Sequence, residues 1–233
     1  MTRILGTLYL VATPIGNLED ITVRALRVLR QVRVIAAEDT RHSLKLLNHY
    51  GFAARLISYH DHNKDTMTAT LVAHLERDDM ALITDAGTPG ISDPGYEIVA
   101  AALDGGFEVE LIPGADAITT LIASASRREI PGVESGMPFR FLGFPPRKEG
   151  AFRVLFERLH HARELLVIYE SPNRLVRTLA LLGDLYGERQ AVVGLELSKF
   201  YEEIARGSLT ELRAYFERAP IRGEVTLAVY PLS

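Results

Sequence analysis

The amino-acid sequence predicts an α/β fold built from two halves. Short apolar runs rich in β-branched residues alternate with amphipathic segments of helical periodicity. This pattern is typical of a mainly parallel sheet with helices on its faces. Pro113-Gly114 interrupts the alternation once, with no low-complexity linker, and 233 residues are enough for two cores. We therefore expect two α/β subdomains, 1–114 and 115–233, that pack closely around a shared cleft where a ligand binds.

The first half contains five expected strands and four expected helices. The strands are short apolar runs, whereas the helical segments repeat apolar residues every three or four positions. The expected strands are 7–12, 34–37, 56–59, 81–84 and 109–112. The expected helices are 21–32, 43–50, 65–77 and 95–104, and Gly51 ends the second of them.

The second half repeats the alternation with one long interruption. A helix is expected over 116–125, with Asp116 as a possible N-cap, and the polar Gly/Pro-containing stretch 127–138 is expected to form a long loop. The expected strands are 139–143, 165–169, 191–195 and 225–230. The expected helices are 151–160, 172–186 and 208–218.

Composition excludes several classes of protein. The absence of cysteine excludes disulfides, thiolate nucleophiles and Cys-based metal sites, and it favours a cytoplasmic protein. No apolar stretch approaches the ~20 residues needed to cross a bilayer, so no membrane span is expected. The apolar run near the N-terminus ends in a turn without a cleavage pattern and is interpreted as the first strand. A net charge of −4 argues against non-specific coating of nucleic acid but allows a local basic patch.

The densest functional signal is the segment 85–95, which holds three Gly and two Pro directly after an expected strand. Open α/β sheets bind ligands at the carboxyl ends of their strands, and glycine lets main-chain groups approach a ligand closely. The segments 12–18 and 112–117 are similar strand-to-loop junctions. The loops at 85–95 and 12–18 are expected to line one pocket. No phosphate loop and no dinucleotide fingerprint is present. A purely structural turn is the alternative.

Seven segments resemble signatures of the tetrapyrrole methylase family, in the branch that modifies ribosomal RNA. They are ATPIGNLEDIT, AAEDTRHS, ITDAGTPGISDPG, IPGADA, LGFPPRK, YESPNRL and GEVTLAV. The resemblance implies two α/β subdomains with S-adenosyl-L-methionine (S-adenosylmethionine) in the cleft between them. It also implies methyl transfer to the ribose 2'-hydroxyl of a cytidine in the decoding region of the small subunit's 16S rRNA. The partner would be that rRNA or the 30S subunit, and the enzyme would be a homodimer.

The resemblance also implies individual site residues. The cofactor is expected to be held by backbone groups of Gly87, Thr88, Pro89, Gly90, Ile91 and Ser92, with Pro14, Ala117, Ile118 and Tyr169 completing the pocket. Substrate contacts are expected at Arg41, Asn173 and Arg174, and Arg147, Lys148 and Arg222 are further candidates for phosphate contacts. Two positions depart from the family pattern: Asn173 replaces His and Ser198 replaces Thr.

Methyl transfer to a hydroxyl requires positioning and a base. Glu170 and Lys199 are predicted as the catalytic residues, and Glu38 and Asp39 are the other candidates for the base. Each has a structural alternative. Glu170 and Lys199 could form a salt bridge with each other, and the pair at 38–39 could cap the following helix.

The tetrad His60-Asp61-His62-Asn63 has a His-x-His spacing that suggests a metal site. The sequence offers no identifiable third ligand, and the family needs no metal for transfer, so we expect no metal and place the tetrad on the substrate side. Two alternatives to an rRNA methyltransferase remain open. They are a methyltransferase acting on a tetrapyrrole or another small molecule, and a cofactor-binding module without catalysis.

Overall fold

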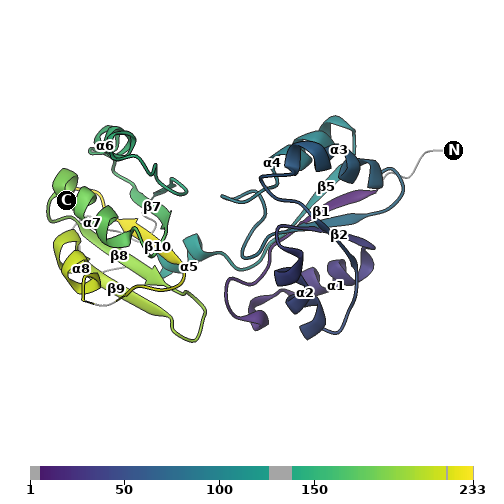
Figure 1. Ribbon diagram of the computed structural model, residues 1–233, viewed down its shortest axis with the longest axis horizontal. Helices are drawn as coiled ribbons and strands as arrows, with labels where there is room; N and C mark the ends of the chain where they lie inside the picture. The colour runs from purple at the N-terminus through teal and green to yellow at the C-terminus, as the bar shows by residue number, and fades with distance from the viewer. Residues whose placement is uncertain (1–5, 126–137, 219, 233) are drawn as a thin grey trace. The chain divides into compact units, whose positions relative to one another are not determined.

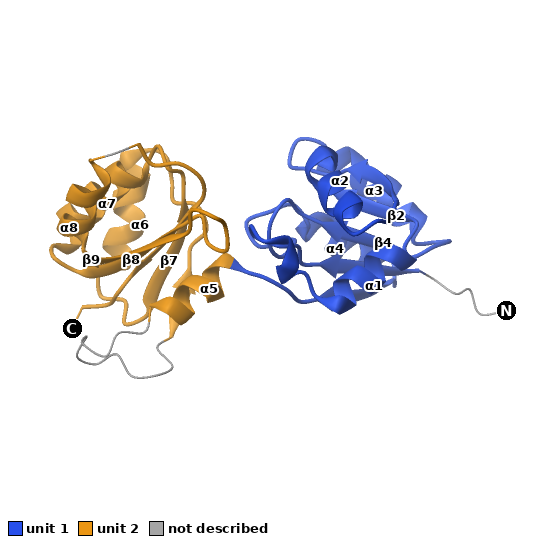
Figure 2. Cartoon of the chain, turned by 90° about the horizontal axis from the view of Figure 1, so that it is seen from below, with its two compact units in different colours: residues 1–116 blue, residues 117–233 orange. Residues whose placement is uncertain are grey.

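Each half of the chain folds around its own five-stranded sheet. The computed structural model describes residues 6–125, 138–218 and 220–232, so most of the expected loop at 127–138 lies outside the described residues. The chain divides into unit 1, Met1–Asp116, and unit 2, Ala117–Ser233 (Figure 2). This boundary lies two residues after the one expected at residue 114.

Unit 1 contains a wholly parallel sheet with strand order β3-β2-β4-β1-β5. Its strands are β1 (Thr7–Val11), β2 (Val34–Ala37), β3 (Arg55–Ser58), β4 (Met80–Ile83) and β5 (Glu108–Ile112). Its helices are the 3₁₀ helix η1 (Leu18–Asp20), α1 (Val23–Gln31), α2 (Thr40–His49), α3 (Lys64–His74) and α4 (Tyr96–Asp104). Because all strands run the same way, the loops that leave their carboxyl ends gather at one edge of the sheet.

Helices cover both faces of this sheet. Figure 1 shows α1 and α2 on one side and α3 and α4 on the other. Alternation along β4 explains this, because Ala81 and Ile83 pack into the core beneath α1 and α2, whereas Met80 and Leu82 pack into the core beneath α3 and α4. The apolar run predicted as a buried strand therefore supplies both cores of the unit.

Unit 2 contains a mixed sheet with strand order β6-β7-β10-β8-β9. Its strands are β6 (Phe139–Phe141), β7 (Leu165–Glu170), β8 (Gln190–Leu195), β9 (Glu203–Ser208) and β10 (Val225–Val229). Its helices are α5 (Ala117–Ser124), α6 (Glu149–Arg158), α7 (Leu175–Tyr186) and α8 (Leu209–Phe216). Apolar side chains of α6, α7 and α8 form its main core against the sheet.

The sequence prediction of a mainly parallel sheet is wrong for unit 2. Only β6 and β7 pair in parallel, whereas β10 pairs antiparallel with β7 and β8, and β8 pairs antiparallel with β9. The cause is strand β9, which the sequence reading missed. The turn at 196–202 includes left-handed backbone at Glu196 and Ser198, and it returns the chain beside β8 as a hairpin. The segment EIARGS carries charges and a glycine instead of an alternating apolar pattern.

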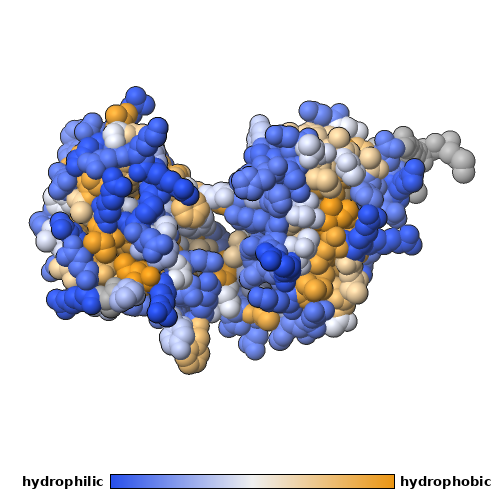
Figure 3. Space-filling model, in the orientation of Figure 1, coloured by the Kyte–Doolittle hydropathy of each residue, from blue (hydrophilic) through white to orange (hydrophobic). Residues whose placement is uncertain are grey.

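The expected α/β elements are otherwise present, with shifted ends. The largest shifts among the unit 1 helices are of three residues: α2 begins at residue 40 instead of 43 because Asp39 caps it, and α3 ends at residue 74 instead of 77. Hydrophilic atoms cover most of the face shown in Figure 3, and the apolar atoms form smaller patches. None of the helices formed by the described residues combines the length and apolar character that crossing a membrane requires.

Candidate functional site

The loops that follow β1 and β4 meet at the carboxyl edge of the unit 1 sheet. Thr13 N donates to Gly87 O at 2.9 Å, and Gly87 N donates to Thr13 O at 3.1 Å. The hydroxyl of Thr13 also donates to the carbonyl of Thr84 at 3.1 Å. The loop after β5 approaches the first loop as well, since a Cβ added to Gly114 would lie 3.0 Å from Ala12 Cβ. Backbone contacts therefore hold Pro14 and Gly87 at one edge.

The loop at 85–95 has an unusual backbone. Gly87 and Gly90 have φ angles of 88° and 85°, and Ser92 has left-handed backbone with φ of 64°. Nothing lies within 4 Å of the position that a Cβ of Gly90 would take, so glycine is required there by the backbone conformation and not by crowding. Non-glycine residues in this conformation cluster at functional sites. The loop presents main-chain groups that a cofactor can bind.

Three carboxyl groups lie at the same edge. Glu38 follows β2, Asp85 follows β4, and Asp93 lies within the loop. The backbone N–H of Asp39 donates to Asp85 Oδ1 at 3.1 Å, and that of Asp85 donates to Glu38 Oε2 at 3.5 Å. Burial is the largest cause and the nearby charge of Glu38 the second, and together they raise the pKa of Asp93 to about 7. Burial, and then the charge of Asp85, also raises the pKa of Glu38. This edge therefore favours a cationic ligand or protonated carboxyl groups.

Asp39 and Arg41 form a local pair at the start of α2. Asp39 is the N-cap and accepts from the backbone N–H of Arg41 at 2.8 Å, so the cap alternative is confirmed for Asp39. The guanidinium of Arg41 donates to the same carboxylate at 3.1 and 2.8 Å. Hydrogen bonds from Arg41 hold the pKa of Asp39 well below its usual range. The Arg41 side chain is 89% exposed.

The histidine tetrad forms a turn after β3. Asn63 Oδ1 accepts from the backbone N–H of His60 at 2.8 Å, and Asn63 Nδ2 donates to Ser58 O at 3.0 Å. The rings of His60 and His62 lie edge to face at 5.9 Å. Within the described ranges, no three His, Asp or Glu side chains are grouped so that they could hold a metal ion.

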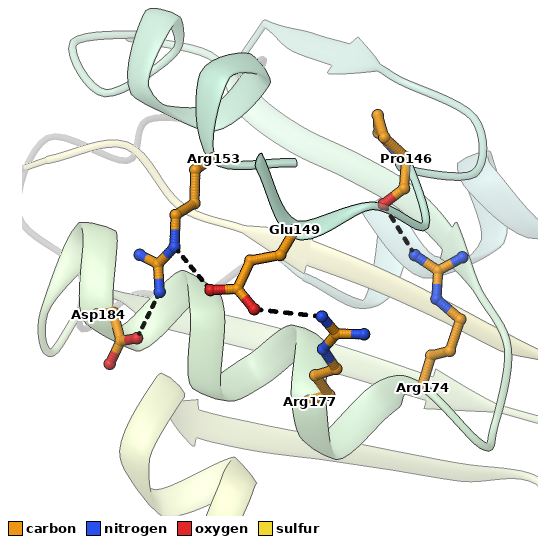
Figure 4. Close-up of polar contacts among 6 residues, drawn as sticks. All are labelled: Pro146, Glu149, Arg153, Arg174, Arg177 and Asp184. Atoms are coloured by element: carbon orange, nitrogen blue, oxygen red, sulfur yellow. Dashed lines mark hydrogen bonds and ion pairs between the residues drawn. The ribbon is translucent and has the colours of Figure 1, made fainter. Parts of the chain in front are cut away.

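In unit 2, Glu170 lies at the end of β7 with its side chain fully buried. Its carboxylate accepts from the backbone N–H of Ser171 at 2.7 Å and from the hydroxyl of Thr178 at 2.6 Å. It also forms an ion pair with Arg174 at 3.4 Å. Arg174 in turn donates to the carbonyls of Pro145 and Pro146 at 3.1 and 3.3 Å; Figure 4 shows the second contact. These partners satisfy the buried charge.

Lys199 lies in the turn between β8 and β9, where its ammonium group contacts Glu196 at 2.7 Å and Glu224 at 3.2 Å. The salt bridge between Glu170 and Lys199 that was considered as an alternative is therefore not formed, because each side chain has nearer partners of its own. Burial lowers the pKa of Lys199, but the hydrogen bond that its ammonium group donates to Glu196 and the charge of Glu224 outweigh burial and leave the pKa raised. The amine stays protonated at neutral pH.

The remaining expected residues lie in unit 2. Ala117 and Ile118 begin α5, and Asn173 is exposed in the turn before α7. The ring of Tyr169 lies 4.9 Å from that of Phe141 and 5.6 Å from that of Phe144. The expected cofactor residues are thus divided, with Pro14 and the 87–92 loop in unit 1 and the others in unit 2.

The sequence reading missed Asp85 and Asp93 as site residues. Their signal was positional, because Asp85 lies two residues after the end of β4 and Asp93 lies eight residues further along the same Gly/Pro-rich loop. Glu38 directly follows β2. Carboxylates that follow the carboxyl ends of parallel strands lie at one edge of the sheet, so this rule predicts the shared edge, whereas the closeness of Glu38 and Asp85 depends on the strand order that makes β2 and β4 neighbours.

Comparison with known proteins agrees with this architecture. The sequence model of the family Tetrapyrrole (Corrin/Porphyrin) Methylases matches residues 7–213. The chain is 48% identical over 226 residues to ribosomal RNA small subunit methyltransferase I of Halalkalibacterium halodurans, covering 96% of this chain and 75% of that protein. It is 44% identical over 230 residues to the protein of the same name from Synechocystis, covering 97% of this chain and 79% of that protein.

Solved structures share the fold at lower sequence identity. The cobalamin biosynthetic enzyme cobalt precorrin-4 methyltransferase superposes with a TM-score of 0.70 at 17% identity, covering 96% of this chain and 94% of that one. A uroporphyrin-III C-methyltransferase from Thermus thermophilus, in complex with S-adenosylhomocysteine, has a TM-score of 0.64 at 20% identity and covers 97% of both chains. These similarities show the fold.

Proposed function

This chain belongs to the tetrapyrrole (corrin/porphyrin) methylase family, and on that premise we propose that it methylates the 2'-hydroxyl of a cytidine ribose in 16S rRNA, using S-adenosylmethionine. The observation that carries the proposal is 44–48% identity, over 96–97% of the chain, to relatives named ribosomal RNA small subunit methyltransferase I. These relatives act on RNA by name, which favours an RNA acceptor over a tetrapyrrole.

The loops of unit 1 fit the cofactor. S-adenosylmethionine supplies an electrophilic methyl group on a positively charged sulfonium. Gly87, Gly90 and Ser92 have positive φ angles, a backbone conformation that lets main-chain groups approach a ligand closely, and Pro14 lies beside the 87–92 loop through the Thr13–Gly87 bridge. The adjacent carboxyl groups suit a cationic ligand. Ala117, Ile118 and Tyr169 of unit 2 are proposed as further contacts of the cofactor.

Among the four candidates for the general base, Glu38 has the most suitable chemistry. Glu170 is buried and bound by three groups, Lys199 stays protonated, and hydrogen bonds hold the pKa of Asp39 low. Burial raises the pKa of Glu38 toward the operating pH, which strengthens a carboxylate as a base. We assign to Glu38 the removal of the proton from the ribose hydroxyl.

The exposed Arg41 is proposed to contact RNA. Asp39 engages two of the five guanidinium donors, which leaves three for phosphate oxygens. The ion pair also restrains the side chain, so that less rotamer entropy is lost when RNA binds. Asn173, exposed before α7, is proposed as a neutral hydrogen-bonding contact.

The function is tested by transfer of labelled methyl from S-adenosylmethionine to small ribosomal subunits that lack their modifications. Nuclease mapping should place the label on a single cytidine ribose. Label on no RNA, with transfer to a tetrapyrrole in a parallel reaction, would establish the small-molecule alternative. Cofactor binding without transfer to either acceptor would identify an inactive module.

We further propose that the protein acts as a homodimer in the cytoplasm. The resemblance to its family supports the dimer, and the proposed ribosomal substrate supports the compartment. Light scattering coupled to size-exclusion chromatography should give twice the chain's mass of 25.8 kDa. A monomeric mass for the active protein would refute the dimer.

A further inference from the structure

The guanidinium group of Arg174 is engaged inside unit 2. One of its nitrogens donates to the carbonyls of Pro145 and Pro146 at 3.1 and 3.3 Å, and its Nε faces Glu170 at 3.4 Å. Its side chain is 25% exposed. A side chain that donates to two backbone carbonyls holds the loop that carries them in place, so Arg174 has a structural role in addition to the phosphate contact expected from the sequence.

Glu170 helps to fix the orientation of the Arg174 side chain. Its buried carboxylate is itself held by Ser171 at the end of β7 and by Thr178 in the second turn of α7. The contacts therefore run without a break from α7, through Glu170 and Arg174, to the loop at 142–148. The removal of any member would leave a buried polar group unsatisfied.

Two further contacts hold the start of the same loop. The backbone N–H of Tyr169 donates to Gly143 O at 3.0 Å, next to the register pairs of β6 and β7. The Phe144 ring, although 59% exposed, rests 5.6 Å from the Tyr169 ring. The loop is thus attached to β7 at one end and to Arg174 in its middle.

Arg147 and Lys148 extend from this attached loop into solvent. Both are exposed, and neither side chain forms a hydrogen bond or an ion pair with any residue in the described ranges. The neighbouring Glu149 does not compensate their charge, because its carboxylate accepts from Arg153 at 3.0 Å and from Arg177 at 3.2 Å (Figure 4). Two adjacent cations on a fixed loop form a preorganised surface for phosphate groups.

We propose that the loop at 142–148 binds the phosphate backbone of the RNA through Arg147 and Lys148, and that Arg174 and Glu170 are positioning residues for this loop. The inference rests on the proposed function and names the surface of unit 2 that holds the substrate. Lysine cannot replace Arg174, because a single ammonium group cannot reproduce contacts that diverge from two guanidinium nitrogens.

The test is the salt dependence of binding to a small-subunit rRNA fragment. The double variant Arg147→Ala with Lys148→Ala should bind about tenfold more weakly at low salt, and the slope of log K against log salt should fall by about 1.4 to 1.8. The KM for RNA should rise, while kcat at saturating RNA and affinity for S-adenosylmethionine stay unchanged. Arg163→Ala is the matched control, since this exposed arginine precedes β7 at the opposite end of the strand.

The energetic coupling between Arg174 and the pair Arg147 and Lys148 distinguishes a positioning role of Arg174 from a general loss of structure. Arg174→Ala should weaken RNA binding in the native background but by less than twofold when Arg147 and Lys148 are already alanine. Arg174→Lys should not restore binding. Equal losses in both backgrounds would overturn the positioning role. Should Arg174→Ala fail to fold, the surface double variant still decides whether the loop binds RNA.

Failure of this inference is distinguishable from failure of the proposed function. Wild-type methylation of the subunit, with an unchanged salt slope in the double variant, would overturn the loop assignment and leave the function standing. The absence of any transfer by the wild-type protein would overturn the function and, with it, this assignment.

Discussion

Replacing Asp93 by Asn should stabilise unit 1 above neutral pH. The carboxyl group is half-buried beside Glu38 and Asp85, and burial with these like charges raises its pKa from the ordinary 3.8 to about 7. A group with a raised pKa in the folded state stabilises the fold fully below its unfolded pKa, and this contribution is lost as the pH rises through the folded pKa. At pH 8 the wild-type protein therefore holds an unfavourable buried charge that the variant lacks.

The size of the effect follows from the two pKa values. The interval between 3.8 and about 7 corresponds to about 4 kcal/mol at 1.36 kcal/mol per pH unit. Solvent screens a half-buried group, so we expect about 2 kcal/mol. The free energy of unfolding of the variant should exceed that of the wild type by that amount at pH 8 and equal it near pH 4.

Urea denaturation at pH 4, 6 and 8 measures the difference in the free energy of unfolding. Asp78→Asn is the matched control, an exposed aspartate of unit 1 whose replacement should change stability by less than about 0.5 kcal/mol at each pH. If Asp93→Asn has the same small effect at pH 4 and pH 8, the charge of Asp93 is not unfavourable in the folded state and the reasoning is refuted.

Three other substitutions test the site. Gly90→Arg should weaken S-adenosylmethionine binding at least tenfold by calorimetry. The control Gly106→Arg imposes similar backbone strain, at φ of 75° after α4, and should leave the affinity for S-adenosylmethionine unchanged. If both variants bind S-adenosylmethionine equally well, the assignment of the 87–92 loop to the cofactor is wrong. Glu38→Gln should lower turnover by about 10²-fold with normal cofactor affinity, a loss typical of a missing base, and a wild-type rate would exclude it. Thr178→Val removes the 2.6 Å hydrogen bond to buried Glu170, and thermal unfolding should reveal a loss of about 1–3 kcal/mol; an unchanged melting temperature would show that water replaces the hydroxyl.

Local patterns predicted most of the elements because both helices and strands leave a periodic signal. Strand β2 was expected over the residues that it occupies, and the Gly/Pro-rich segment after β4 was expected as a ligand-binding loop at a strand's carboxyl end. Strand β9 was missed because it is an edge strand with charges and a glycine, and its pairing with β8 provides the order that its own sequence lacks.

The sequence by itself determined the α/β class, the strand-end loops and, through its motifs, the family. These properties depend on neighbouring residues along the chain, so they can be read locally. Only the tertiary structure decided that Arg174 binds the carbonyls of Pro145 and Pro146 and that Lys199 pairs with Glu196 and Glu224. It also decided that Asp93 shares its edge with Glu38, from another strand. The partner and burial of a charged side chain depend on strand order and register, which join residues distant in sequence, and the charge itself carries no signal of either.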